Sequence, residues 1–189
     1  MSQEDRQKWD GKYTDAQAAP AIPSVHLTKL TDVLPRGGRA LDIAGGAGRH
    51  ALWLAERGLD VTLVDISQRG LAIALARAKE RQLTLHTVCR DLEAEALPEG
   101  PFDIVVAFHY LQRSLWPALR TVLAPGGWLV LVQPTEINLE RHSRPPAGFL
   151  LKPSEGRNVT EGLDVVRYEE GWLEEGRHEA LVVARRHLQ

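Results

Sequence analysis

The sequence has 189 residues, of which 43% are hydrophobic and 25% charged, and its formal net charge is −2. This length suits one domain that buries a sizeable core without disulfides. The weak negative charge argues against a nucleic-acid or anionic-membrane partner, and no apolar run is long enough to span a bilayer. The polar N-terminus lacks a signal-peptide pattern and the single cysteine, Cys89, excludes an intrachain disulfide, so we expect a cytoplasmic protein.

The first half of the chain alternates short strand patterns with longer helical ones. Residues 39–44 predict a strand that leads into a glycine-rich turn and a helix. Residues 60–65 predict a second strand, and Ser67 is a suitable N-cap for the helix that follows it. Residues 84–91 predict a third strand, in which Cys89 is expected to be a buried, small apolar residue.

The second half continues this alternation and then ends in a hairpin. Pro117 suits the first turn of a helix that the "APGG" stretch, residues 124–127, brings to an end. Residues 134–150 lack any periodicity and predict a long functional loop. The remaining strand patterns cover residues 102–108, 128–134, 163–172 and 177–186. The whole pattern predicts an α/β, doubly wound sheet with an antiparallel pair of strands at its edge.

The glycine-rich stretch "LDIAGGAGRH" raises the question of which nucleotide ligand it holds. The spacing from Gly46 to Ala51 fits the dinucleotide fingerprint, and Asp65 lies 19 residues beyond Gly46, so a nicotinamide cofactor stays possible. Asp42, however, precedes the turn, where its carboxylate would repel a pyrophosphate but suit an ammonium and a sulfonium. Asp91 ends the third strand, so three aspartates are expected to line one crevice at the carboxyl ends of the strands.

These motifs resemble the class I S-adenosylmethionine-dependent methyltransferases. The resemblance rests on Asp42 through Gly48, "LVDIS", Asp91-Leu92, "FDIVVAF" and "LAPGGWLVLV", and covers about residues 38 to 187. It implies a Rossmann-like sheet of seven strands in the order 3-2-1-4-5-7-6, with Asp65 on the ribose hydroxyls and Asp91 and Leu92 at the adenine. More narrowly, "WDGKY", "GAGRHALWLAERG", "FHYLQRSLWPALRTVLAPGG" and "FLLKPSEG" resemble the small tellurite-resistance-like methyltransferases.

Several of the candidate cofactor residues have a structural alternative. Arg49 either meets the methionine carboxylate or pairs at the surface, and Phe108 either borders the methionine chain or lies in the core. Trp9 and Tyr13, four residues apart, form either a lid over the cofactor or one face of a helix packed on the sheet. The full set of expected cofactor-binding residues is Asp42, Ala44, Gly45, Gly46, Gly48, Arg49, Asp65, Ile66, Asp91, Leu92, Phe108, Trp9 and Tyr13.

The turn departs from the family pattern at one position. Ala44 stands where the family has its first glycine, and Gly45 stands where a cysteine is common. Because Ala44 carries a Cβ, we expect it to adopt a negative φ or to leave slightly more room than a glycine. Gly45, Gly46 and Gly48 are expected to let the backbone approach the ligand.

The acceptor side is less sharply defined by the sequence. His109 and Tyr110 directly follow the strand 102–108, where the methyl group should emerge, and either is a candidate to deprotonate or orient a nucleophile. For His109 the alternative is a hydrogen-bonded structural histidine. Arg113, Arg141 and Arg144 fall in loops on the ligand side and suggest a pocket for an anionic acceptor, the alternative being solvated surface charge. No metal-ligand spacing is present.

The sequence as a whole predicts one methyltransferase domain over residues 1–189. It divides into an N-terminal helical lid (1–36), a cofactor-binding core (37–133), a substrate-side loop (134–160) and a terminal β-hairpin (161–189). The expected reaction is methyl transfer from S-adenosylmethionine to a small, anionic or soft acceptor by a monomer or homodimer, without nucleic-acid or membrane partners. The alternatives are a nicotinamide-dependent oxidoreductase and a non-catalytic S-adenosylmethionine-binding module.

Overall fold

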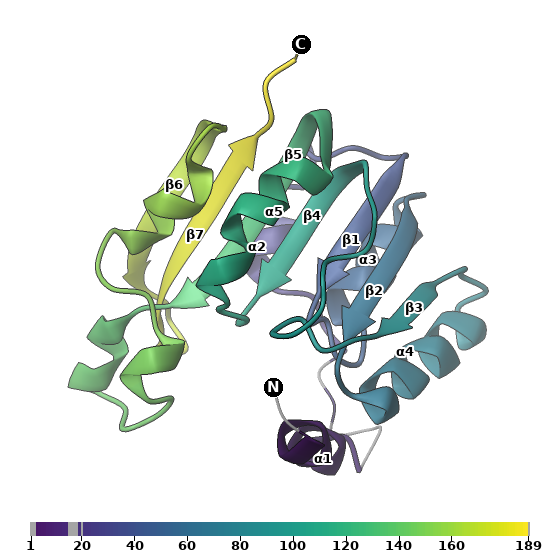
Figure 1. The fold of residues 1–189 in the computed structure, drawn as a ribbon, viewed down its shortest axis with the longest axis horizontal. Coiled ribbons are helices and arrows are strands. Elements are labelled where there is room, and N and C mark those ends of the chain that lie inside the picture. The colour runs from purple at the N-terminus through teal and green to yellow at the C-terminus, as the bar shows by residue number, and fades with distance from the viewer. Residues whose placement is uncertain (1–2, 15–18, 20, 189) are drawn as a thin grey trace.

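The computed structural model, which describes residues 3–14, 19 and 21–188, has one seven-stranded sheet in the predicted order β3-β2-β1-β4-β5-β7-β6 (Figure 1). Strands β1 to β5 run parallel to one another, whereas β7 is antiparallel to both β5 and β6. The strands are β1 (Arg39–Ile43), β2 (Asp60–Asp65), β3 (His86–Cys89), β4 (Phe102–Phe108), β5 (Leu123–Pro134), β6 (Asp164–Trp172) and β7 (His178–Arg185).

Helices lie on both faces of this sheet, and one helix lies at the carboxyl ends of its parallel strands. They are α1 (Gln3–Lys12), α2 (Val25–Thr28), α3 (Arg49–Glu56), α4 (Gln68–Glu80) and α5 (Trp116–Val122). The Ser67 side chain accepts a hydrogen bond from the Gly70 amide and so caps α4 as predicted, and Pro117 lies in the first turn of α5. None of the helices in the described residues is both long and apolar enough to cross a membrane.

Two predictions about the strands were wrong in detail. Strand β3 is shorter than expected, and Cys89 at its end is exposed, because β3 is the outermost strand of the sheet. Strand β5 begins at Leu123, directly after α5, so residues 124–127 belong to the strand and do not form a separate turn. A register shift between Phe102 and Ile104 accommodates this irregular start.

The segment between β5 and β6 is more regular than the predicted loop. It contains short 3-10 helices at Glu136–Glu140, Ala147–Phe149 and Glu155–Thr160. An isolated bridge between Thr135 and Leu151 ties the start of this segment to its middle. Figure 1 shows α1 beneath the carboxyl ends of β1, β2 and β4, and residues 136–149 beneath the end of β5. Both segments therefore lie at the carboxyl ends of the strands, where ligands bind in open α/β sheets.

Two apolar layers hold the carboxyl ends of the strands in place. One lies between the sheet and helices α2, α3 and α4, and the other lies on the opposite face beneath α5 and the 3-10 helix at Glu155–Thr160. The central strands contribute to both layers, since their successive side chains alternate between the faces. A sheet packed on both faces holds its strand ends rigidly, so polar residues just past those ends have defined positions.

Candidate active site

A cleft of about 1240 Å³ opens at the carboxyl ends of the parallel strands. Its walls include Ala44 after β1, Asp65 at the end of β2, His109 after β4 and Gln133 near the end of β5. Helix α1 closes one side of the cleft, and residues 141–146 close another. The volume exceeds the about 300–1,000 Å³ typical of a single-ligand pocket, so the cleft has room for more than one small ligand.

The glycine-rich turn is shaped by the protein's own packing. The Asp42 side chain is fully buried beneath it, and its Oδ2 accepts a hydrogen bond from the Ala51 amide at 2.9 Å. A Cβ on Gly45 would lie 2.4 Å from that Oδ2 and 2.3 Å from Leu63. Burial raises the pKa of the Asp42 carboxyl to about 7, even though the Ala51 hydrogen bond opposes the shift. Asp42 thus supports the turn from below and does not line the cleft.

Tyr13 lies directly over Gly46, where a Cβ would come within 1.9 Å of its hydroxyl oxygen. The space at Gly48 is similarly filled by Ala74, so these glycines make room for protein side chains. Ala44 does line the cleft, but at φ +52, which corrects the expected negative value. A left-handed alanine is strained by about 1–2 kcal/mol, a cost that the surrounding turn must sustain.

Asp65 connects this turn to the second strand. Its two carboxylate oxygens accept hydrogen bonds from the Gly46 and Ser67 amides, each at 2.8 Å. Burial raises the pKa of the Asp65 carboxyl, and these backbone hydrogen bonds offset part of that shift. The side chain lines the cleft together with the neighbouring Ile66. An oriented carboxylate at this position suits a ligand that offers two adjacent hydroxyl groups.

Helix α1 is attached to the start of α4 next to Asp65. Asp10 accepts hydrogen bonds from the Ser67 hydroxyl at 2.7 Å and from the Arg69 amide at 3.1 Å. This contact positions Trp9 and Tyr13 on the cleft side of the helix. Burial raises the pKa of the Tyr13 hydroxyl to about 12, so the group stays protonated at neutral pH. The predicted pair therefore forms one wall of the cleft.

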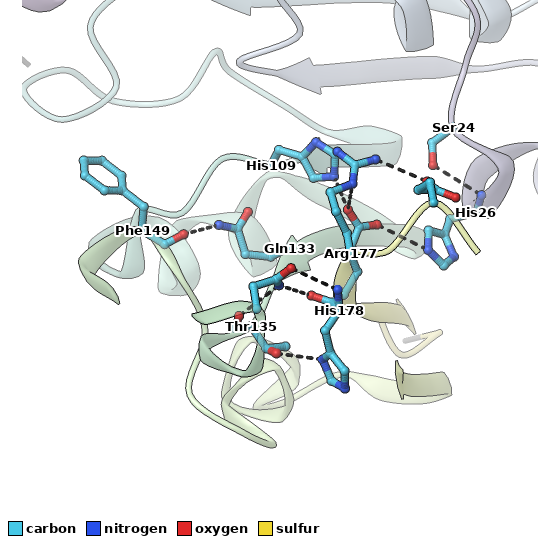
Figure 2. Close-up of polar contacts among 11 residues, drawn as sticks. Ser24, His26, His109, Gln133, Thr135, Phe149, Arg177 and His178 are labelled. Atoms are coloured by element: carbon cyan, nitrogen blue, oxygen red, sulfur yellow. Dashed lines mark hydrogen bonds and ion pairs between the residues drawn. The ribbon is translucent and has the colours of Figure 1, made fainter. Parts of the chain in front are cut away.

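His109 opposes this wall at the other end of the cleft, beyond β4. Its backbone has φ +58, and its amide donates a hydrogen bond to the Val132 carbonyl at 2.8 Å. Its Nε2 lies 2.8 Å from Oε1 of Glu179, a residue of β7 whose side chain is only 2% exposed (Figure 2). The neighbouring Tyr110 also lines the cleft, and no hydrogen-bond partner for its buried hydroxyl is found among the described residues.

Comparisons with known proteins agree with this geometry. A sequence profile of the methyltransferase domain matches residues 40–127. A demethylmenaquinone methyltransferase of Thermus thermophilus is 39% identical over 103 residues, which make up 50% of this chain and 46% of that enzyme. The structure of TehB from Haemophilus influenzae has a TM-score of 0.73 at 21% identity, over 96% of this chain and 66% of that one. The N-methyltransferase NodS from Bradyrhizobium japonicum, in complex with S-adenosylhomocysteine, gives 0.72 at 19% identity, over 96% and 97%.

The chain carries a methyltransferase domain at residues 40–127 and has the sheet of the class I S-adenosylmethionine-dependent methyltransferases. The predicted family, sheet order and cofactor are thereby confirmed, and the nicotinamide alternative is not favoured. The likeness to TehB and NodS, at 21% identity and below, concerns the fold alone. The chain spans about half the length of the curated relatives it matches, at 46%, 46% and 50% of the first three.

Several residues expected at the cofactor have structural partners in this methyltransferase. Asp91 accepts a hydrogen bond from the Glu93 amide at 2.9 Å and does not line the cleft, whereas the adjacent Leu92 does. Phe108 lies in the apolar core with its ring 4.0 Å from that of His50. Arg49 is half-buried and does not line the cleft; burial lowers the pKa of its guanidinium, although the charges of Asp42 and Glu179 oppose that shift. Of these positions, only Leu92 contributes directly to the cleft surface.

The three candidate arginines of the methyltransferase are separated by the structure. Arg141 and Arg144 line the cleft, and the Arg141 guanidinium stacks 3.7 Å above the Trp172 ring. Arg113 points elsewhere: its Nε and Nη2 donate to the two carboxylate oxygens of Glu155 at 2.5 and 2.7 Å. That bidentate pair anchors the segment between β5 and β6 and leaves Arg113 outside the cleft.

Sequence reasoning missed Arg177, Glu179 and Gln133 of the methyltransferase site. Arg177 and Gln133 line the cleft; the Gln133 Nε2 donates to the Phe149 carbonyl at 2.7 Å, while its Oε1 is buried without a partner among the described residues (Figure 2). The sequence signal that could have indicated Glu179 is its position directly before the apolar run of residues 180–184. Since β7 is antiparallel to β5, its first residues lie beside the carboxyl end of β5, where Glu179 pairs with Pro134.

Proposed function

We propose that this methyltransferase transfers the methyl group of S-adenosylmethionine to a small acceptor that is anionic or a soft nucleophile. The observation that carries the proposal is the division of one cleft into two chemically different ends. Asp65, Ile66 and Leu92 lie at or just after the ends of β2 and β3 on one side of β1, whereas His109, Arg141 and Arg144 follow β4 and β5 on the other, and all six line the cleft. Residues of helix α1 line this cleft, and we expect the helix to shield the bound cofactor from water.

The first end fits the cofactor in both shape and polarity. The Asp65 carboxylate is oriented by backbone hydrogen bonds and lines the cleft, so we assign it to the ribose hydroxyls. Ile66 and Leu92 are apolar surfaces suited to the adenine, with the Asp91 loop as its polar border. Trp9 and Tyr13 form the lid. The remaining members of this assignment are Asp42, Ala44, Gly45, Gly46, Gly48, Arg49 and Phe108, which shape the turn and the wall behind it.

The second end aligns the acceptor. Bound S-adenosylmethionine supplies an electrophilic methyl group on a sulfonium. The contribution of the chain is to hold the nucleophile about 3 Å from that carbon along the line of attack. A thiolate or a reduced oxyanion needs no base, whereas a hydroxyl or amine acceptor loses a proton, and His109 is placed to take it with Tyr110 as a neighbouring orienting group.

The charge of the second end supports an anionic acceptor. Arg141, Arg144 and Arg177 all line it, and the cleft there also borders His109 and His142. Guanidinium groups pair with carboxylates and other oxyanions through two parallel hydrogen bonds. The demethylmenaquinone methyltransferase among the relatives carries a small molecule in its name and supports the same acceptor class.

A macromolecular acceptor is the competing possibility, because other relatives are named for tRNA and for ribosomal protein L11. The net charge of −2 favours a small acceptor, since a polyanionic RNA binds best to an extended basic surface. A screen of S-adenosylhomocysteine formation with small carboxylates, thiols and phenols, with total tRNA as a parallel arm, separates the two classes. Turnover of tRNA alone would overturn the small-acceptor proposal.

Cofactor assignment is tested by calorimetric titration with S-adenosylhomocysteine, with NADH in a parallel run. Asp65→Asn should weaken S-adenosylhomocysteine binding at least about 100-fold, because each hydrogen bond to a charged group is worth about 1.5–3 kcal/mol. Asp60→Asn is the matched control, since Asp60 starts the same strand but pairs at the far surface with His86 at 3.1 Å. NADH binding, or equal affinity in both variants, would contradict the assignment.

A further inference from the structure

Glu179 is a buried carboxylate shared by cationic groups from three parts of the chain. Besides the contact of Oε1 with His109 Nε2 at 2.8 Å, Arg177 Nε lies 3.4 Å from Oε1 and His26 Nε2 lies 3.5 Å from Oε2. His109 follows β4, Arg177 precedes β7, and His26 belongs to α2. Figure 2 shows these side chains converging from their separate elements. The proposed roles of the cofactor residues do not use this cluster.

The arrangement keeps Glu179 ionised. Burial alone would raise the pKa of its carboxyl, but the hydrogen bond from His109, the contact with His26 and the positive charge of Arg177 outweigh burial and hold that pKa well below its usual value. A buried charge costs several kcal/mol when it is unpaired, so several partners around one carboxylate compensate that cost together. At neutral pH the carboxylate can therefore only accept hydrogen bonds.

Because Glu179 can only accept hydrogen bonds, it determines the tautomer of the His109 ring. Because an ionised carboxylate has no proton to donate, the Nε2 that lies 2.8 Å from it must carry one. The main chain cannot adjust freely, since the His109 amide is bonded to the Val132 carbonyl and φ is +58. Left-handed conformations of non-glycine residues are uncommon and concentrate at functional sites. Backbone and carboxylate together fix a ring that lines the cleft.

We propose that Glu179 is a positioning residue that holds His109 with Nε2 protonated and Nδ1 ready to accept a proton. This inference rests on the proposed methyl transfer to a hydroxyl or amine acceptor. There the acceptor proton moves to Nδ1, and the electron pair of the broken O–H or N–H bond stays on the acceptor atom, which forms the new bond to the methyl carbon. The electrons of the carbon–sulfur bond leave with sulfur as a neutral thioether, and Glu179 balances the charge of the imidazolium.

The other charged groups around the ring make Glu179 necessary for this role. Arg177, which precedes β7, and His26, on α2, contact the same Glu179 carboxylate as His109. His50 on α3 stays neutral, because burial lowers its pKa to about 2 with help from the charges of Arg49 and His109. Removal of the Glu179 charge would leave His109 facing arginines with no adjacent carboxylate to compensate.

The test is long-range proton–nitrogen NMR of the 15N-labelled protein above the pH at which histidines ordinarily titrate, about 6.5. His109→Gln identifies the signals. In the wild type we expect one neutral ring with a slowly exchanging proton on Nε2 and a bare Nδ1. In Glu179→Gln, which preserves side-chain size, and in Glu179→Ala, that proton should exchange rapidly with water. Glu169→Gln, at an exposed site on β6, is the matched control.

Two results would overturn the proposal. One is a wild-type His109 with its proton on Nδ1 or on both nitrogens, and the other is an Nε2 proton that is equally protected in Glu179→Gln. Titration of the same variants with S-adenosylhomocysteine distinguishes a failure of the proposed function from a failure of the role proposed for Glu179. We expect the Glu179 variants to bind S-adenosylhomocysteine as tightly as the wild type does. A wild-type protein that does not bind S-adenosylhomocysteine would contradict the proposed function. His109 signals that are unchanged in the Glu179 variants would contradict only the role of Glu179.

Discussion

The two ends of the cleft are built in different ways. The cofactor end is centred on the glycine-rich turn and the end of β2, and its polar contacts are mostly between a carboxylate and backbone amides, as in the bonds of Asp65 to Gly46 and Ser67. The acceptor end joins side chains from β4, the segment after β5 and the start of β7, as in the pair of His109 with Glu179. Backbone contacts within a motif can be read from spacing, whereas side-chain contacts across a sheet depend on topology.

This contrast predicts a large effect for a change in the glycine-rich turn. Gly46→Ala adds a Cβ 1.9 Å from the Tyr13 hydroxyl at φ +56, so it should displace Tyr13 and α1 as well as strain the turn. We expect S-adenosylhomocysteine affinity to fall at least about 30-fold by calorimetry, since displacement and left-handed strain together cost about 2 kcal/mol or more. Trp9 fluorescence should report the movement of α1.

Gly176→Ala separates strain from displacement in that experiment. Gly176 has φ +85 in the hairpin turn, and a Cβ there would meet nothing within 4 Å. It should lose a similar amount of stability to strain but retain full cofactor affinity. If Gly46→Ala and Gly176→Ala lost the same amount of S-adenosylhomocysteine affinity, the two ends of the cleft would not be independent, which would contradict the comparison made above.

A second prediction concerns the carboxylate buried beneath the turn. The folded pKa of Asp42 is raised to about 7 from its ordinary 3.8, so the folded state binds the extra proton between these values. Stability contributed by the protonated form is present at low pH and is lost as pH rises through about 4 to 7. Urea unfolding of Asp42→Asn should lack this loss, which amounts to about 1.4 kcal/mol per pH unit within that window. Parallel pH curves for wild type and variant would disprove it.

The smallest predicted effect belongs to the arginines of the acceptor end. Arg141→Met and Arg144→Met should each lower kcat/KM for an anionic acceptor about tenfold, the value of one charge-assisted contact, and leave a neutral acceptor nearly unchanged. Arg113→Met is the matched control, since its guanidinium pairs with Glu155 outside the cleft. Equal losses on both acceptor types would remove the anion preference from the proposal.

Much of the fold followed from local chemistry in the sequence. The hydroxyl of Ser67 and the ring of Pro117 specify helix starts whatever the rest of the chain does, and both helices begin there. Ala44 shows the limit of such reasoning: the turn around it, not its own preference, sets φ at +52. Glu179 was missed because its partners at residues 26 and 109 are distant in sequence, and only the antiparallel placement of β7 brings them together.

The reversed direction of β7 has a consequence for how this molecule can diversify. Because that strand starts at the carboxyl end of β5, the hairpin turn before it and the segment after β5 both line the cleft end that we propose for the acceptor, without contributing to the glycine-rich turn. Insertions and substitutions in these exposed connections are tolerated better than changes in the sheet. A lineage can therefore exchange one acceptor for another by remodelling the last third of the chain, while the machinery that recognises the methyl donor is inherited intact.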